Sequence, residues 1–409
     1  MSWLPRTPQS SGALNLNPEQ QLANSAIPTH HTMASICHRC AVRLRHAAQA
    51  APTRAFSTTP AAQRAVPAFT ESPNPELNEL FSLIRTKLFL PNYLDRRERN
   101  LIFKEKYRQM LLDNPPTVEM GDEEFTLEPL DKRRDLPARC PTVRKALDIM
   151  MEKDSKDWHQ LPTLMQGLKQ GLNKPLRLET QEKIIRKAVH ADQMGVILQC
   201  LETPERTGMD LKRDGVRRTL LYGLRELAQK KDWHRKATDK ALRNANLVSR
   251  LLESEEHGGG RNLKENDPRT RPETVGIFLE LAAVYAYRHA GAKDDTGLVK
   301  AYAERLTSCL ERASVEPHGL NLVKRTKASE DRVSTHARQW PMLSAIPIWH
   351  GIFLAQKILG EDMPNNAIAT KAIADYETRL NALAAELESD EPTPYGQEAL
   401  AAWRACIRD

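Results

Sequence analysis

Residues Val275–Tyr287 read VGIFLELAAVYAY and are apolar on nearly every side of a helix with 3.6 residues per turn. A helix without a polar face has to be buried, so we expect this one at the centre of a helical fold. The composition of the 409-residue chain agrees, because only 5% of its residues are aromatic, only 18 are glycine and 28% are charged. This composition disfavours β-rich folds and predicts an all-α protein.

A series of further helices surrounds this segment, with prolines near several of the expected starts. The apolar spacing predicts a helical body over residues 141–388, followed by a linker and a last helix over 389–409. Two polar segments, 257–271 and 317–339, interrupt the body, and we expect both to be mobile surface loops. The expected helices cover residues 141–153, 158–171, 178–190, 192–203, 214–230, 233–254, 272–290, 295–313, 341–359, 365–388 and 396–408.

Residues 57–116 form an expected N-terminal segment with a basic helical arm. Its first helix should begin at Pro75, with Asn74 as the cap, and end at Pro91. Its second helix, over Leu94–Asp113, carries six basic side chains: Arg96, Arg97, Arg99, Lys104, Lys106 and Arg108. The linker 117–140 begins with a loosely alternating stretch, which predicts either a short hairpin or an extended arm.

The helix expected over residues 365–388 carries a coiled-coil-like seam. Its apolar residues alternate steps of four and three, at Ala369, Ile373, Tyr376, Leu380, Leu383 and Leu387. Such a seam requires a long partner helix. We expect an antiparallel partner within the same chain, and a dimer is the alternative.

A four-residue motif occurs twice in the body. Lys156–His159 reads KDWH, and the same four residues recur at Lys231–His234. The Asp would cap a helix, and the Trp would fill the groove between neighbouring hairpins. The interval between the two copies suits two helical hairpins, so the motif predicts a solenoid-like repeat body.

One stretch, Ala191–Trp233, resembles a known repeat family. The features that carry the resemblance are Leu198, Cys200, Leu201, the turn at Thr207 and Gly208, and the segment LLYGL at residues 220–224. They resemble one hairpin leading into the next in the pentatricopeptide-like helical-repeat proteins of organelle gene expression, which include mitoribosome-associated proteins of fungal mitochondria. The proline usual after the turn glycine is absent. The resemblance implies a helical-hairpin array involved in RNA handling, and it assigns no base-reading residue.

The N-terminal residues 1–56 have the composition of a mitochondrial presequence. No Asp or Glu occurs between Gln20 and Thr70, and arginine is the only fully charged basic residue there. Met33 reads as a second start site, and Arg54 and Phe56 mark the expected processing site. We therefore expect import into the mitochondrial matrix, and a disordered basic tail is the alternative.

The sequence does not predict a membrane span. The longest apolar stretch, Pro341–Ala355, contains His350, and we expect it to be too short and too polar to cross a bilayer.

The sequence contains no recognisable active site. It lacks a nucleophile elbow, a glycine-rich phosphate loop and a paired-histidine zinc motif. Cys37 and Cys40 have zinc-knuckle spacing, but no second pair exists and both lie in the expected presequence. His350 is expected to be a hydrogen-bonded core residue. We therefore expect no catalytic residue, no metal and no cofactor.

Local basic clusters are the remaining candidates for a site. The net charge is +7, and residues 1–56 account for four of these charges, so the rest of the chain is only mildly basic. Two clusters flank the helix expected over 214–230, and aligned turns of a solenoid would join them into one ridge for RNA phosphates. The alternative is ordinary solvation of helix surfaces. The expected RNA-contact residues are Lys212, Arg213, Arg217, Arg218, Lys231 and Arg235.

Taken together, these features predict a non-catalytic mitochondrial matrix protein that is a component or associate of the mitochondrial ribosome, or an RNA-related gene-expression factor. Its expected partners are the mitochondrial ribosome or mitochondrial RNA, and other matrix proteins. Two alternatives stay open: an assembly factor of a respiratory-chain complex that binds a protein partner, and an enzyme of unrecognised type.

Overall fold

The structure is a computed structural model that describes residues 65–152, 154–263, 267–315, 340–389 and 394–407. In these residues the only strands are β1 (Thr117–Met120) and β2 (Glu123–Thr126), which form an antiparallel hairpin. All other regular structure is helical, so the predicted all-α fold is confirmed, and residues 117–130 adopt the hairpin alternative. The presequence with Met33, Arg54 and Phe56, the pair Cys37 and Cys40, and the loop 317–339 lie outside the described residues.

The N-terminal arm begins with α1 (Pro75–Leu83), capped by the side chain of Asn74 as predicted. A π-helical turn over Ile84–Phe89 follows and leads into α2 (Leu90–Tyr93). The predicted end of this helix at Pro91 is wrong. Pro91 lies in the first turn of α2, where its missing N–H is not needed, because the π turn changes the hydrogen-bond register before it.

The second helix of the arm is broken. It consists of α3 (Arg96–Phe103), a 3-10 turn over Glu105–Tyr107, and α4 (Arg108–Asp113). Lys104 interrupts the expected continuous helix because its backbone is extended, with a ψ of 124°.

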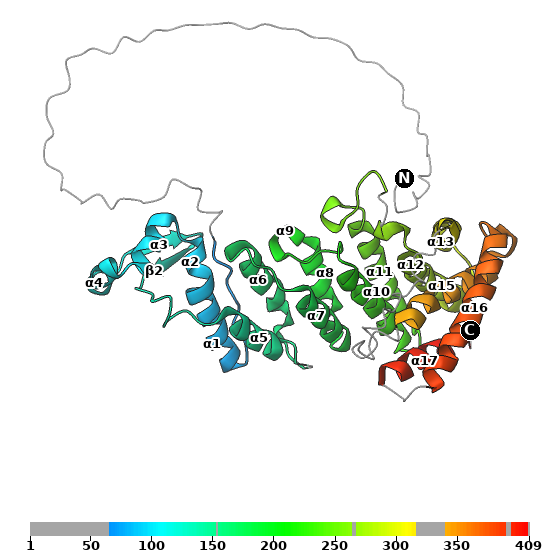
Figure 1. Ribbon diagram of the computed structural model, residues 1–409, viewed down its shortest axis with the longest axis horizontal. Helices are drawn as coiled ribbons and strands as arrows, with labels where there is room; N and C mark the ends of the chain where they lie inside the picture. The colour runs from blue at the N-terminus through cyan, green and yellow to red at the C-terminus, as the bar shows by residue number, and fades with distance from the viewer. Residues whose placement is uncertain (1–64, 153, 264–266, 316–339, 390–393, 408–409) are drawn as a thin grey trace, which may run out of the picture. The chain divides into compact units, whose positions relative to one another are not determined.

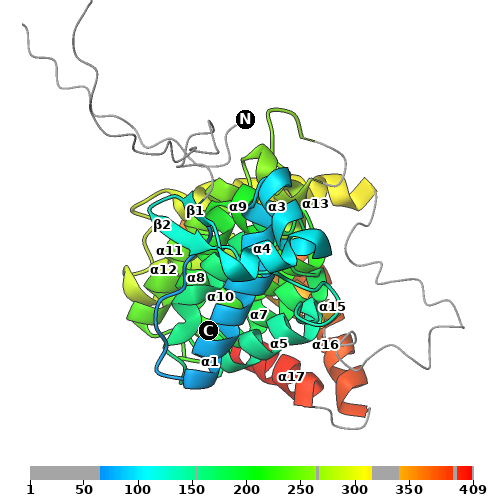
Figure 2. The same cartoon turned by 90° about the vertical axis from the view of Figure 1, so that its left-hand side faces the viewer.

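Close backbone approaches dock the arm on the body. A Cβ added to Gly167 would lie 2.0 Å from the ring of Phe89, and one added to Gly171 would lie 2.7 Å from the ring of Tyr93. The two glycines therefore make room for the aromatic side chains of the arm. Helix α1 also lies beside α5 (Arg139–Met150) of the body (Figure 2).

The first part of the body is a series of helical hairpins (Figure 1). Helices α7 and α10 pack together in one layer, and α6, α8 and α11 pack successively in the other. The short helix α9 (Pro204–Thr207) precedes Gly208, which has a left-handed φ of +71°. The main helices are α5 (Arg139–Met150), α6 (Leu161–Gln166), α7 (Leu178–His190), α8 (Met194–Glu202), α10 (Asp214–Gln229) and α11 (Arg235–Leu251).

The repeated KDWH motif marks equivalent places two hairpins apart. Trp158 precedes α6 and Trp233 precedes α11, in the same layer, and each side chain is only 2% exposed. The prediction that Asp caps the following helix is wrong at both places. Asp157 is buried and accepts a hydrogen bond from Ser72 of the arm, and Asp232 lies in a left-handed turn.

The C-terminal part is organised around two long helices. These are α12 (Pro272–His289), which is buried along most of its length as predicted, and α15 (Trp340–Leu359), which packs along it. The others are α13 (Leu298–Val315), α16 (Asn366–Ser389) and α17 (Pro394–Cys406). The seam of α16 packs mainly on α15, so its partner lies within the same chain.

Helix α15 agrees within one residue with the helix expected over 341–359. With the 3-10 turn that follows, Trp340–Asp362 is long and apolar enough to cross a membrane by length and composition alone. The prediction that this stretch is too short is therefore wrong. However, 61% of its most apolar window is buried inside the protein, which identifies α15 as a core helix.

The described part of the loop 257–271 is anchored, in contrast to the expected mobile surface loop. His257 is buried between the backbone N–H of Leu211 and the backbone carbonyl of Leu201. Asp267 and Arg269 form a second buried contact, at 2.7 Å. Hydrogen bonds between buried polar groups therefore hold this loop in place, although its sequence has no apolar pattern.

Candidate functional site

The two predicted basic clusters lie at opposite ends of one helix. Lys212 and Arg213 are exposed just before α10, and Lys231 and Arg235 are exposed where α10 gives way to α11. Since α10 has 16 residues, its ends are about 24 Å apart at 1.5 Å per residue. The predicted continuous ridge is therefore wrong, because consecutive turns of a helical hairpin array fall on alternate edges.

Arg217 faces the interior, although it is one helical turn from exposed Arg213. It donates hydrogen bonds to the backbone carbonyl of Leu211, at 3.2 Å, and to Asp214, at 2.5 Å. Its side chain is 5% exposed, and burial lowers the pKa of its guanidinium below the usual value. This geometry gives Arg217 a structural contact at the start of α10.

Arg218 is half-exposed and lies over an aromatic ring. Its guanidinium carbon is 4.5 Å from the centre of the Trp340 ring, and its ion pair with Asp214 spans 3.8 Å. Lys231 also has a partner, since its ammonium lies 3.1 Å from a carboxylate oxygen of Asp192. Lys212, Arg213 and Arg235 form no ion pair with any other described residue.

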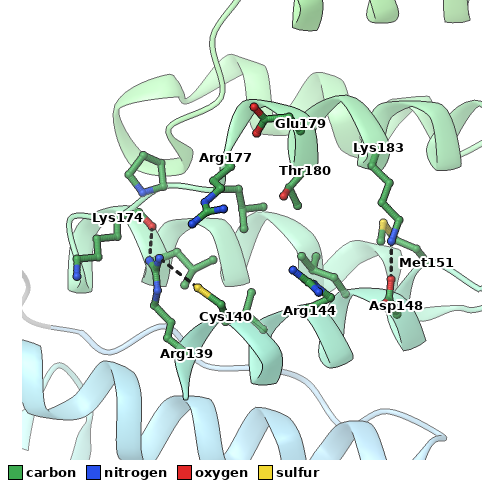
Figure 3. Close-up of a pocket in the computed structure, with 15 residues that line it drawn as sticks. Arg139, Cys140, Arg144, Asp148, Met151, Lys174, Arg177, Glu179, Thr180 and Lys183 are labelled. Atoms are coloured by element: carbon green, nitrogen blue, oxygen red, sulfur yellow. Dashed lines mark hydrogen bonds and ion pairs between the residues drawn. The ribbon is translucent and has the colours of Figure 1, made fainter. Parts of the chain in front are cut away.

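A second basic site lies between α5 and α7, which stand apart while α7 and α10 pack closely. Figure 3 shows this groove, which has a volume of about 670 Å³. Its floor is apolar, and its rim carries five cationic and two acidic side chains. The charged residues are Arg139, Arg144, Lys174, Arg177, Lys183, Asp148 and Glu179. We call this site the α5–α7 groove.

Sequence reasoning missed the α5–α7 groove because its cations come from two helices and the loop between α6 and α7. No run of basic residues marks it in the chain. The basic residues that recur at steps of three and four on the polar side of α7 are a partial signal, because only the first of them lines the groove. They are Lys183, Arg186, Lys187 and His190.

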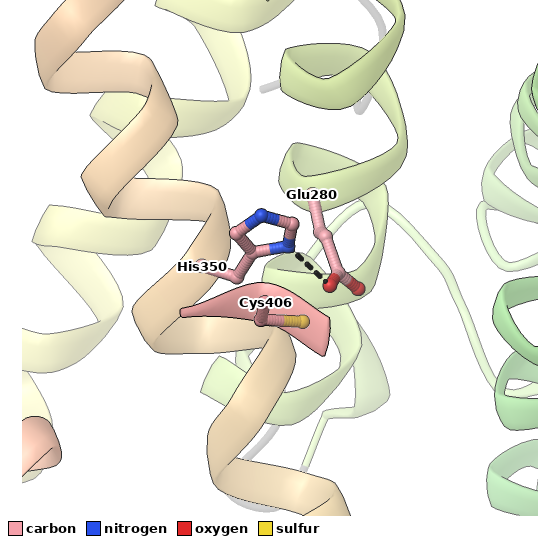
Figure 4. Close-up of side chains that lie close together, drawn as sticks. All are labelled: Glu280, His350 and Cys406. Carbon is pink, nitrogen blue, oxygen red and sulfur yellow. Dashed lines mark hydrogen bonds and ion pairs between the residues drawn. The ribbon is translucent and has the colours of Figure 1, made fainter. Parts of the chain in front are cut away.

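A buried polar cluster joins α10 to three helices of the C-terminal part. Glu280 of α12, His350 of α15 and Cys406 of α17 offer side-chain atoms within 4.8 Å of one another (Figure 4). The His350 Nδ1 donates a hydrogen bond to Glu280 at 2.8 Å, so His350 is a satisfied core residue as predicted. Arg225 of α10 donates two further bonds to the same carboxylate. A divalent cation there would lie beside a guanidinium, so these residues suit an ion-pair network rather than a metal.

The charge of this network follows from its partners. Burial alone would raise the pKa of Glu280, but Arg225 and His350 hold it below its ordinary value. The carboxylate is therefore ionised at neutral pH. Its hydrogen-bonding partners Arg225 and His350 are both buried in the core.

Comparison with known proteins identifies the family. The family model of the mitochondrial ribosomal protein mS27 matches residues 54–405. The small ribosomal subunit protein mS27 of Neurospora crassa is 30% identical over 273 residues, which cover 62% of this chain and 68% of the relative. These matches favour the ribosomal interpretation over the assembly-factor and enzyme alternatives, and they confirm the predicted non-catalytic role and the mitochondrial matrix location. The chain belongs to the mitochondrial ribosomal protein mS27 family.

Proposed function

We propose that the chain is a helical scaffold of the mitochondrial ribosome that contacts RNA through its exposed basic side chains. The observation that carries this proposal is the pair of basic clusters at the two ends of α10. Lys212 and Arg213 form one, and Lys231 and Arg235 form the other. Cations that flank a rigid helix at a fixed spacing suit phosphates, which dominate affinity for RNA without reading its sequence.

Arg218 and Arg217, the other two residues expected from the sequence, have different parts in this proposal. Arg218 keeps its guanidinium at the surface over Trp340, next to the first cluster, and stays a proposed RNA contact. The guanidinium of Arg217 is occupied by Leu211 and Asp214, so we expect it to position the start of α10.

The salt dependence of RNA binding tests this proposal. The full-length chain is titrated with a labelled 20-nucleotide single-stranded RNA over a series of salt concentrations. The variant with Lys212, Arg213, Lys231 and Arg235 all changed to Gln should reduce the slope of log affinity against log salt by about 3, at about 0.7 per phosphate. The control carries Arg243→Gln, Lys293→Gln and Lys371→Gln, which remove three exposed charges elsewhere, against four in the test variant. A slope that is unchanged in the first variant, or reduced equally in both, would contradict the proposal.

We infer further that residues 1–56 are a presequence removed after Phe56. The acid-free, arginine-bearing composition supports this, and so does the start of the family match at residue 54. Mass spectrometry of the protein from mitochondria should find an N-terminus shortly after Phe56. Peptides from residues 1–32 in the matrix form would show the inference to be wrong.

We also propose that the α7–α8 and α10–α11 hairpins are successive units of the pentatricopeptide type. The order of their elements supports this, because α8 is followed by the left-handed turn at Gly208 and then by α10 with Tyr222. The packing of α7 on α10 and of α8 on α11 matches two stacked hairpins. An experimental structure that superposes these two hairpins on each other would test the assignment.

A further inference from the structure

We propose that the α5–α7 groove binds one phosphodiester backbone of an RNA strand. This inference rests on the proposed function, because it names a second RNA-binding site of the same scaffold. The groove is a real cavity, of about 670 Å³, and is not simply a basic patch on one helix. Its three sides are α5, the loop before α7, and the first two turns of α7.

Charge is the first argument. The rim has five cations against two acids, which leaves a net charge of +3. Lys183 is paired with Asp148 at 2.8 Å, and Arg139 donates to the backbone carbonyl of Lys174 at 3.2 Å. Arg144 and Arg177 form no ion pair or hydrogen bond through their side chains with any described residue. These two guanidinium groups are therefore available to a ligand, and Figure 3 shows both extending into the space between α5 and α7.

The type of side chain is the second argument. The planar fork of a guanidinium matches two oxygens of a phosphate, and it is less strongly hydrated than an ammonium. Thr180 adds a hydroxyl donor on the same rim. An arginine-rich cleft with a hydroxyl group nearby therefore fits a chain of phosphates.

The floor of the groove argues against a protein partner. Protein interfaces gain most of their affinity from apolar and aromatic anchors that fill exposed pockets. Three apolar side chains beneath the groove, Val143, Leu147 and Leu168, are each no more than 5% exposed. They offer no open pocket for an apolar anchor, and most of the charged side chains on the rim are cationic.

The basic surface continues along α7. Lys183 also lines a second cavity of about 590 Å³, between α7, α10, α15 and α17, together with Arg186, Lys187 and His190. From Arg177 to His190 the path along α7 is about 20 Å at 1.5 Å per residue. Phosphates in one strand of a DNA duplex are about 3.4 Å apart along its axis, and on this scale the path along α7 spans several phosphates. One strand could follow α7 from the groove into the second cavity.

The test uses the full-length chain with three substitutions of residues that line the groove, Arg144→Gln, Lys174→Gln and Arg177→Gln. None of the three replaced side chains has an ion-pair partner among the described residues, so no acid is left unpaired. The control is the variant with Arg243, Lys293 and Lys371 changed to Gln, which loses the same charge outside both cavities. Circular dichroism should show the same helicity for both, because Gln is a comparable helix former.

The probes are a labelled 20-nucleotide single-stranded RNA and a polyglutamate peptide. We expect the groove variant to lower the salt slope of RNA binding by about 2, at about 0.7 per phosphate, and the control to leave it unchanged. An unchanged RNA slope in the groove variant would overturn the inference. If that variant lost only polyglutamate binding, the groove would be a site for an acidic protein and the inference would again be wrong.

The outcome separates this inference from the proposed function. If the α10 variant loses slope and the groove variant does not, only the groove inference fails. If the slope of log affinity against log salt falls in the groove variant and not in the α10 variant, the groove inference is supported. The α10 clusters would then be ordinary solvated surface charges. If the unsubstituted chain binds no RNA at any salt concentration, both fail.

Discussion

Arg225 of α10 and Glu280 of α12 form a doubly hydrogen-bonded ion pair that is closed to solvent. The Arg225 Nε and Nη2 atoms lie 2.6 and 2.9 Å from the two carboxylate oxygens, and the side chains are 3% and 0% exposed. His350 of α15 donates to the same carboxylate, and Arg225 also donates to Gln229 and to the sulfur of Cys406. The pair therefore joins the hairpin array to the C-terminal helices.

Removing the charge of Glu280 should strongly destabilise the fold. In Glu280→Gln the Arg225 guanidinium stays buried without a counter-charge, which costs about 3–5 kcal/mol in the free energy of unfolding. Urea unfolding followed by circular dichroism measures this. The matched control is Glu388→Gln, which breaks the exposed pair with Arg404 and should cost less than about 1 kcal/mol. Equal losses in the free energy of unfolding for the two substitutions would mean that the buried pair contributes no more to stability than the exposed one.

His257 should make the protein sensitive to mild acid. Its Nδ1 accepts the N–H of Leu211 at 3.2 Å and its Nε2 donates to the carbonyl of Leu201 at 2.9 Å, so the ring is neutral. Burial lowers the pKa of His257 below its ordinary 6.5. The unfolded chain therefore takes up a proton at higher pH than the folded one, and stability that is complete above pH 6.5 is lost as the pH falls through the folded pKa.

The measurement for His257 is the urea midpoint at pH 7.5 and pH 5.5. The unsubstituted chain should lose more stability between these values than His257→Gln, which cannot titrate. The variant should be the less stable of the two at pH 7.5, because it loses the fitted pair of hydrogen bonds. Parallel losses in the two proteins would assign the acid sensitivity to other groups.

Two glycines let α12 and α15 approach each other. A Cβ on Gly276 would lie 2.8 Å from a side-chain carbon of Ile348 and 3.1 Å from its Cα, and a Cβ on Gly351 would lie 3.0 Å from the backbone nitrogen of Glu280. We expect Gly276→Ala and Gly351→Ala each to destabilise the fold by about 1–3 kcal/mol through overpacking.

The control for these glycines is Gly195→Ala in α8, where an added Cβ meets nothing within 4 Å. That substitution should leave stability unchanged or raise it by up to about 1 kcal/mol, because Ala is the better helix former. Thermal unfolding of the three variants gives the comparison. A destabilised Gly195→Ala, or an unaffected Gly276→Ala, would contradict the close approach.

Local signals in the sequence predicted most of the helices. The helices expected over residues 178–190, 214–230, 272–290 and 365–388 are observed within one residue of those bounds. These signals are local: a proline at a helix start, as at Pro272, and a long apolar periodicity. They can therefore be recognised in the sequence without knowledge of the tertiary structure.

Features set by contacts between distant segments were not predictable in this way. The π turn at Ile84–Phe89 and the break at Lys104 have no local marker. The α5–α7 groove depends on the separation of two helices, which no residue pattern reports. Arg213 and Arg217 share one helical face by spacing, yet only packing decides that one is exposed and the other buried.

The contrast between Arg213 and Arg217 gives a last prediction. The two residues carry the same charge one turn apart, but Arg217 is bonded to Leu211 and Asp214, whereas Arg213 forms no ion pair with another described residue. Arg217→Gln should cost about 1–3 kcal/mol in the free energy of unfolding, because a buried carbonyl loses its donor, and should leave the salt slope of RNA binding unchanged. Arg213→Gln should do the reverse, with stability unchanged within about 0.5 kcal/mol and a slope reduced by about 0.7. Urea unfolding and RNA titration of both variants measure the two effects. A salt slope that falls with Arg217→Gln and not with Arg213→Gln would place the RNA contact at the buried side chain. That result would contradict the roles assigned to the two residues.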